Sequence, residues 1–172
     1  MKKIFILILL TCVFSIGLFA QTFRVAYINK ERIINEANDA KEAHRLFQMD
    51  RQNWERQVSD ITKEIEALET QFETMRLTLS ESGRNEFEDR IRRRYKEREQ
   101  LVESILGDRG LATRRNEELL APIMEKLRGI IDRIALDEGF AVIFDASATG
   151  IIWAQERLDI TAQVIAEMNK ER

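Results

Sequence analysis

The sequence predicts an α+β protein in which a long antiparallel coiled-coil helical hairpin projects from a small β-sheet base. Three observations predict this class. Apolar residues spaced alternately three and four positions apart run through the middle of the chain. A short stretch of serine and glycine interrupts them, and a second helical pattern follows it. Short strand-like segments occur near both ends.

The N-terminal residues 1–20 have the pattern of a secretory signal peptide. Lys2 and Lys3 precede an uncharged run over residues 4–19, and the small residue Ala20 then offers a cleavage position. We therefore expect a signal peptide that is cleaved after about Ala20, so that the chain is exported. An uncleaved membrane anchor is the alternative, although such an anchor usually has a longer apolar run.

The composition favours an interaction protein over an enzyme. The chain has one His, one Cys and 33% charged residues, and its formal net charge is −3. Cys12 lies inside the signal peptide, so the exported chain is expected to have no disulfide and no thiol chemistry. His44 stands alone, and no phosphate-binding loop or nucleophile motif appears. We expect no enzymatic activity, no cofactor and no metal, and the acidic balance argues against nucleic-acid binding.

After the signal peptide, residues 23–28 have the pattern of a short strand, and the polar segment 29–35 leads into the arm. From residue 36 a helical pattern continues to residue 79, which at about 1.5 Å per residue makes an arm about 65 Å long. The mean spacing of 3.5 residues keeps one apolar seam on one face of the helix, and that seam requires a partner helix. The seam residues are Trp54, Val58, Ile61, Ile65, Leu68, Phe72, Met75 and Leu79.

Residues 80–84 form the predicted tip of the hairpin. Ser80, Ser82 and Gly83 supply capping oxygens and a permissive backbone at the point where the chain must reverse. The return helix then resumes an apolar face and completes a hairpin over residues 36–138.

Three residues interrupt the helical propensity of the return helix. Gly107 and Gly110 each cost about 1 kcal/mol relative to alanine in a helix. Pro122 removes a backbone donor and should bend the helix just before it. Two interpretations are open: a flexible hinge in the arm, or a fixed local bend.

The two ends of the mature chain, 21–35 and 139–172, form the predicted base. Residues 140–144 and 151–154 have the pattern of strands, and a last helix begins near Thr161. A base of this size is too small to stand alone without cross-links, so copies of it should pack together. The residues expected at this homo-oligomeric interface are Val25, Tyr27, Ile28, Val142, Phe144 and Ile152.

Several segments resemble the OmpH-like (Skp) family of periplasmic chaperones. Residues 25–29 and 32–36 resemble the opening strand of that family and the start of its arm. Residues 122–127, 138–145 and 158–161 resemble its closing half. These segments occur in the order of the family, around a coiled-coil hairpin and behind a signal peptide, and they cover nearly the whole mature chain.

The resemblance implies a jellyfish-like homotrimer in the periplasm. It implies an ATP-independent holdase, which would bind unfolded outer-membrane β-barrel proteins in a cavity between the arms and prevent their aggregation before membrane insertion. The alternative function is that of a periplasmic coiled-coil structural adaptor, which docks another envelope component through the hairpin tip.

Basic side chains near the tip are candidates for contact with anionic lipid or with client proteins. Because Glu97 and Glu99 are interleaved with them, an ordinary solvated helix face with short-range ion pairs is the alternative. A second basic pair resembles a spot proposed in the family for lipopolysaccharide binding. The candidates are Arg92, Arg93, Arg94, Lys96 and Arg98 near the tip, and Arg114 and Arg115 in the second pair.

Overall fold

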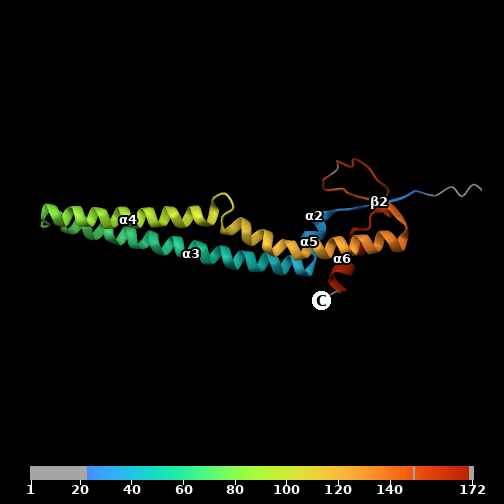
Figure 1. Cartoon of the computed structure of the whole chain (residues 1–172), viewed down its shortest axis with the longest axis horizontal. Helices are drawn as coiled ribbons and strands as arrows, with labels where there is room; N and C mark the ends of the chain where they lie inside the picture. The colour runs from blue at the N-terminus through green and yellow to red at the C-terminus, as the bar shows by residue number, and fades with distance from the viewer. Residues whose placement is uncertain (1–22, 149, 171–172) are drawn as a thin grey trace, which may run out of the picture.

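The computed structural model describes residues 23–148 and 150–170, and the predicted signal peptide lies outside these residues. Figure 1 shows a long helical hairpin that projects from a small base, where the two ends of the described chain meet. The predicted α+β class, with a helical hairpin on a small sheet, is therefore confirmed.

One unbroken helix forms the outward half of the arm, and two helices form the return. Helix α3 (Asn38–Met75) spans the arm, α4 (Glu81–Leu106) lies along its distal part, and α5 (Leu111–Glu138) lies along its proximal part (Figure 1). Helix α5 continues past the start of α3 into the base. The return therefore has a break that the outward helix does not share.

The predicted seam from Trp54 to Phe72 is buried or half-buried along the arm, whereas Met75 is exposed and Leu79 lies beyond the end of α3. Ile65 on α3 and Ile105 on α4 are buried, and the rings of Phe72 and Phe87 stack across the distal part with their centroids 5.9 Å apart. Charged residues occupy most of the exposed positions between the seam residues. Burial of a single apolar stripe explains why two such polar helices pair.

The tip lies slightly earlier in the sequence than the predicted segment 80–84. Helix α3 ends at Met75, and α4 already begins at Glu81. Ser80 is the N-cap of α4, and its side-chain oxygen accepts a hydrogen bond from the backbone N–H of Gly83 at 3.2 Å. The serine thus starts the return helix instead of ending the outward one, and the reversal takes place over residues 76–80.

The base contains a two-stranded parallel sheet. Strand β1 (Arg24–Ile28) pairs with β2 (Phe140–Asp145), so the two ends of the chain are joined by main-chain hydrogen bonds. The predicted third strand at 151–154 is wrong, because residues 150–155 form no strand. Ile152 is fully exposed there, and the segment between β2 and the last helix loops away from the base (Figure 1). The outer edge of β1 is bridged by Asp159, which lies opposite Tyr27, and not by residues 151–154.

Helices α2 (Lys30–Glu36) and α6 (Thr161–Lys170), preceded by the short 3-10 helix η1 (Glu156–Leu158), close the base around the proximal end of the arm. Their buried side chains share one core with α3 and α5. Thr161 is fully buried; its Oγ1 accepts a hydrogen bond from the backbone N–H of Asn29 at 2.9 Å and donates one to Asp159. The main buried residues of this core are Ala26, Ile28, Ile33, Ala37, Ala40, Ala43, Ile123, Leu127, Ile130, Ile134, Ile160, Val164 and Met168.

Gly139 ends α5 in the left-handed conformation, with φ 67° and ψ 35°. We expect Gly139→Ala to lower the free energy of unfolding by about 1–2 kcal/mol, because an L-residue is strained there. An added Cβ would meet no atom within 4 Å, so the cost comes from the backbone alone. The matched control is Gly129→Ala inside α5, which has equal space and should stabilise by about 1 kcal/mol. Urea unfolding of both variants checks this, and effects of the same sign would contradict it.

Asp145 joins the end of β2 to the first turn of α2. Its Oδ1 accepts hydrogen bonds from the backbone N–H of Lys30 at 3.4 Å and from the backbone N–H and hydroxyl of Ser147 at 3.0 and 2.5 Å. Burial raises the pKa of this carboxyl, but the hydrogen bonds from Ser147 and Lys30 outweigh burial and leave the pKa below its ordinary value.

A lowered pKa in the folded state makes part of the stability depend on pH. The contribution of Asp145 is complete above the pKa of the unfolded chain, about 3.9, and is lost as the pH falls through the lower folded-state pKa. We expect the free energy of unfolding to fall below about pH 4, and to fall less steeply in Asp145→Asn. Urea titrations from neutral pH downwards measure both slopes, and parallel curves would contradict the prediction.

Candidate functional site

Some basic residues near the tip hold helix α4 against α3, and the others face solvent. Arg94 of α4 pairs with Glu64 of α3 at 2.5 Å and with Glu97 at 2.7 Å. The hydroxyl of Tyr95 donates a hydrogen bond to Glu69 of α3 at 2.8 Å, and this bond is the main reason that the pKa of Tyr95 is raised. Arg94 and Tyr95 therefore hold α4 against α3.

The other basic residues near the tip have weaker attachments. Arg98 lies over the ring of Tyr95, 5.0 Å from its centroid, and Arg92 lies 3.8 Å from Asp89. Arg93 and Lys96 are exposed and have no carboxylate within ion-pair distance among the described residues. The arm thus presents a mixed face, with ion pairs at Arg92 and Arg94 and, within the described part of the chain, unpaired cations at Arg93 and Lys96.

The second basic pair is divided in the same way. Arg115 of α5 pairs with Asp50 of α3 at 2.8 Å and with Glu118 at 3.1 Å. Arg114 is exposed on the same helix. Arg115 therefore holds α5 against α3 in the proximal arm, and Arg114 is the member of the pair that faces solvent.

The break in the return lies at residues 107–110, with both predicted glycines at its ends. Gly107 caps α4, Gly110 precedes α5, and Arg109 between them has the left-handed φ of 57°. A Cβ on Gly107 would lie 2.5 Å from the carbonyl oxygen of Glu103, and one on Gly110 would lie 2.5 Å from that of Ile105. The two glycines are thus required by close backbone approach.

Pro122 lies inside α5, and the helix continues on both sides of it. The Pro122 side chain is exposed. The break at 107–110 and Pro122 both lie beside the unbroken helix α3, because α3 lines the hollow at the break and the ion pairs Arg115–Asp50 and Lys126–Asp39 join α5 to α3 on either side of Pro122. Any bending of the arm at these levels would also require α3 to bend.

A hollow beside this break is lined mainly by apolar side chains. We call it the break groove; it has a volume of about 750 Å³. Leu106, the last residue of α4, is 72% exposed on its wall. The lining residues are Phe47, Arg51, Trp54, Glu55, Val58, Ser59, Val102, Ile105, Leu106 and Ala112. This groove was not predicted from the sequence, although Leu106 beside Gly107 and Gly110 is a signal that could have indicated it.

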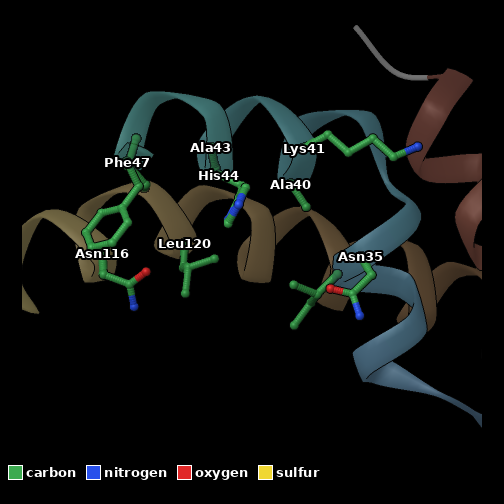
Figure 2. Close-up of a pocket in the computed structure, with 10 residues that line it drawn as sticks. Asn35, Ala40, Lys41, Ala43, His44, Phe47, Asn116 and Leu120 are labelled. Atoms are coloured by element: carbon green, nitrogen blue, oxygen red, sulfur yellow. The ribbon is translucent and has the colours of Figure 1, made fainter. Parts of the chain in front are cut away.

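A second hollow, which we call the proximal groove, lies between the start of the arm and α2. Its volume is about 450 Å³. Figure 2 shows His44 and Phe47 of α3 on one side, and Asn116 and Leu120 of α5 on the other. The remaining lining residues are Ile34, Asn35, Ala40, Lys41, Ala43 and Leu119.

The residues predicted for self-association lie on two different sides of the sheet. Ile28 is buried in the core of the protomer, so it is not available to a second copy. The alternation along β1 places Val25 and Tyr27 on the opposite face, half-buried. Val142 is half-buried, whereas Phe144 and Ile152 are exposed.

Sequence analysis missed Trp153, which is 77% exposed. It lines a small hollow of about 350 Å³ with Val25, Tyr27, Phe144 and Ile151. The sequence does mark Trp153 as a candidate for an interface, because a tryptophan beside two isoleucines in a short polar region is unusual for a loop. The base therefore exposes a connected set of large apolar side chains around β1 and the 150–155 segment.

Within the described ranges 23–148 and 150–170, no cluster of three or more His, Cys, Asp or Glu side chains is arranged to hold a metal ion. No helix in the described part of the chain combines the length and apolar character that crossing a membrane needs.

Comparison with known proteins identifies relatives of the whole described architecture. The family model for outer membrane protein (OmpH-like) matches residues 24–168. The chain has no match among curated proteins. It is similar to the crystal structure of a candidate outer membrane chaperone (OmpH-like) from Caulobacter crescentus CB15, with a TM-score of 0.77 and 11% sequence identity. That alignment covers 86% of this chain and 85% of the other, and at such low identity it supports the fold alone.

Proposed function

Because the chain belongs to the OmpH-like family, we propose that it is an ATP-independent holdase chaperone for unfolded outer-membrane β-barrel proteins. The observation that carries the proposal is the family match over residues 24–168, on a chain whose described part is an arm with exposed apolar grooves. We propose a periplasmic location, reached by cleavage of the signal peptide after about Ala20. The protein would hold its clients until they insert into the outer membrane.

We propose that three copies assemble through the base, formed by residues 21–35 and 139–172, and that the arms over 36–138 enclose a shared cavity. The exposed apolar side chains around β1 support this, because a folded monomer rarely leaves such a set uncovered. We now assign the interface to Val25, Tyr27, Val142, Phe144, Ile152 and Trp153.

Holding would depend on many weak contacts. Apolar side chains in the grooves and the aliphatic parts of Lys and Arg would touch a non-native chain briefly. Several such contacts gain strength from high effective concentration, while each one breaks easily. Release would then require no nucleotide, only a more stable folded or inserted state of the client.

The basic residues and the break would have secondary roles. We propose that Arg92, Arg93, Lys96 and Arg114 are available to anionic lipid, lipopolysaccharide or acidic client segments, whereas Arg94, Arg98 and Arg115 chiefly stabilise the arm. We further propose that Gly107, Gly110 and Pro122 form a fixed bend, because both glycines pack closely against backbone and α3 is continuous beside them.

Two measurements without ATP test the proposed function. The mass of the protein in solution, with and without an unfolded barrel protein, should show a trimer and then a trimer with one bound client. Light scattering should show slower aggregation of several unrelated barrel proteins on dilution from urea. Unchanged aggregation of all of them would refute the proposal.

A structural adaptor is the second candidate, because Leu77 at the tip of the arm is 92% exposed. Photo-crosslinking from the positions of Arg92 and Arg94 in cells distinguishes the two candidates. One recurring partner that does not depend on unfolded clients would favour the adaptor, whereas a spread of barrel proteins would favour the chaperone.

A further inference from the structure

The two grooves of the arm lie on the same flank of α3 and share Phe47. His44, Phe47, Arg51 and Glu55 line them in turn, and they are spaced three or four residues apart. Residues with this spacing lie on one face of a helix. The proximal groove and the break groove therefore meet end to end at Phe47.

The opposite wall comes from both return helices, with Val102, Ile105 and Leu106 of α4 before the break and residues of α5 after it. Ala112 of α5 lines the break groove, and Asn116, Leu119 and Leu120 of the same helix line the proximal groove. These residues again have the three-and-four spacing of one helix face. Together the two hollows make one channel along the arm, which we call the flank groove.

The length of the flank groove limits what can fill it. On α3 its lining extends from Ala40 to Ser59, which at about 1.5 Å per residue corresponds to about 29 Å. An extended strand rises about 3.3 Å per residue, so about nine residues fill this length. A membrane-spanning β-strand has about 9–11 residues, so one such strand matches the groove.

The distribution of side chains across the groove also fits a strand. Its floor is apolar, with Phe47, Trp54 and Val58 half-buried on α3, whereas Lys41 and Glu55 stand exposed at the rim. Strands of outer-membrane barrels alternate apolar and polar side chains, and would therefore place one kind on the floor and the other towards the rim and solvent. The rim pair Arg51–Glu55, at 3.2 Å, carries both signs and so favours a polypeptide over an anionic lipid.

We propose that the flank groove binds one extended segment of about nine residues from an unfolded outer-membrane barrel protein, with its apolar side chains on the floor. The inference rests on the proposed function, to which it adds a specific contact surface and a client pattern. The arm would select alternation of apolar and polar residues over simple hydrophobicity.

Photo-crosslinking to defined peptides tests the groove directly. One peptide of about ten residues alternates leucine or tyrosine with serine or threonine, and a second has the same composition with the apolar residues in one block. A photoreactive residue replaces His44 or Glu55 in the groove, or Gln57 as a control, since Gln57 is exposed on α3 outside the lining. We expect the alternating peptide to crosslink from the two groove positions and not from the control, and to exceed the block peptide.

A second pair of variants tests the groove by substitution, and the folding of both variants is checked separately. Ala112→Glu places a charge in the groove, and we expect it to weaken binding of the alternating peptide about tenfold, which corresponds to about 1.4 kcal/mol. Leu77→Ser, at the tip, should leave binding unchanged, and circular dichroism confirms that both variants fold. Fluorescence of Trp54 in a Trp153→Phe background reports the binding.

The outcomes separate this inference from the function on which it rests. Equal crosslinking from all three positions, or equal binding of both peptides, overturns the flank groove even if aggregation of barrel proteins is still suppressed. Selective crosslinking without any suppression of aggregation would support the groove as a peptide site and refute the chaperone function.

Discussion

Trp153→Asp is expected to convert the proposed trimer into monomers while the protomer stays folded. Trp153 is 77% exposed in the protomer, so an aspartate at this position should change the free energy of unfolding of the protomer only slightly. In the trimer the same carboxylate would be buried against Phe144 and β1 of the base, and an unpaired buried charge costs several kcal/mol. Light scattering should therefore report the mass of one chain in place of three.

The control for this prediction is Leu77→Asp, which introduces the same charge at a residue that is 92% exposed at the tip. It should keep the trimeric mass, and both variants should keep the circular dichroism of the parent protein. A trimer that persists with Trp153→Asp would remove the 150–155 segment from the interface. The proposed assembly would then need another surface.

Leu127→Ala is expected to lower the free energy of unfolding by about 3 kcal/mol. Leu127 is 2% exposed and lies in the core where α5 meets α2, α3 and α6. Removal of its branched end leaves a cavity that the surrounding helices fill only in part. Such a change is a large part of the stability of a small domain, so the arm would detach more easily from its base.

The matched control is Leu136→Ala on the same helix, where the leucine is 83% exposed. It should change the free energy of unfolding by no more than about 0.5 kcal/mol. Urea unfolding followed by circular dichroism measures both values. Similar losses in the two variants would contradict the assignment of the core to the inner face of α5.

Local patterns predicted the arm well because a helix and its seam depend on neighbours in the sequence. Three-and-four spacing placed Ile65 in the seam, and the structure buries it. Low helix propensity at Gly107 and Gly110 predicted a hinge or a bend within the return helix, and the structure has a break between two helices at residues 107–110. The tip was misplaced by a few residues, because Ser80 can either end one helix or start the next, and only its hydrogen bond to Gly83 decides.

The candidate site was predicted less well, because it depends on which residues of distant segments come together. Arg94 and Arg115 were candidates for contact with lipid or client, and only partners on their own helix could be expected from the sequence, yet each has a carboxylate partner on α3. Ile28 looked like an interface residue, yet it faces the protomer core. In both cases the partner is far away in the sequence, so no local pattern reports it.

The sequence by itself therefore determined the helices, their seam and the strand propensity of the two ends, because these follow from side-chain spacing and backbone preference. Tertiary structure decided which strand pairs with which and where the arm is hollow. The 151–154 segment shows the difference: its residues favour a strand, but they pair with neither β1 nor β2, and the bridge to Tyr27 of β1 is made by Asp159 instead. The flank groove arises in the same way, since it exists only where a broken helix packs beside an unbroken one.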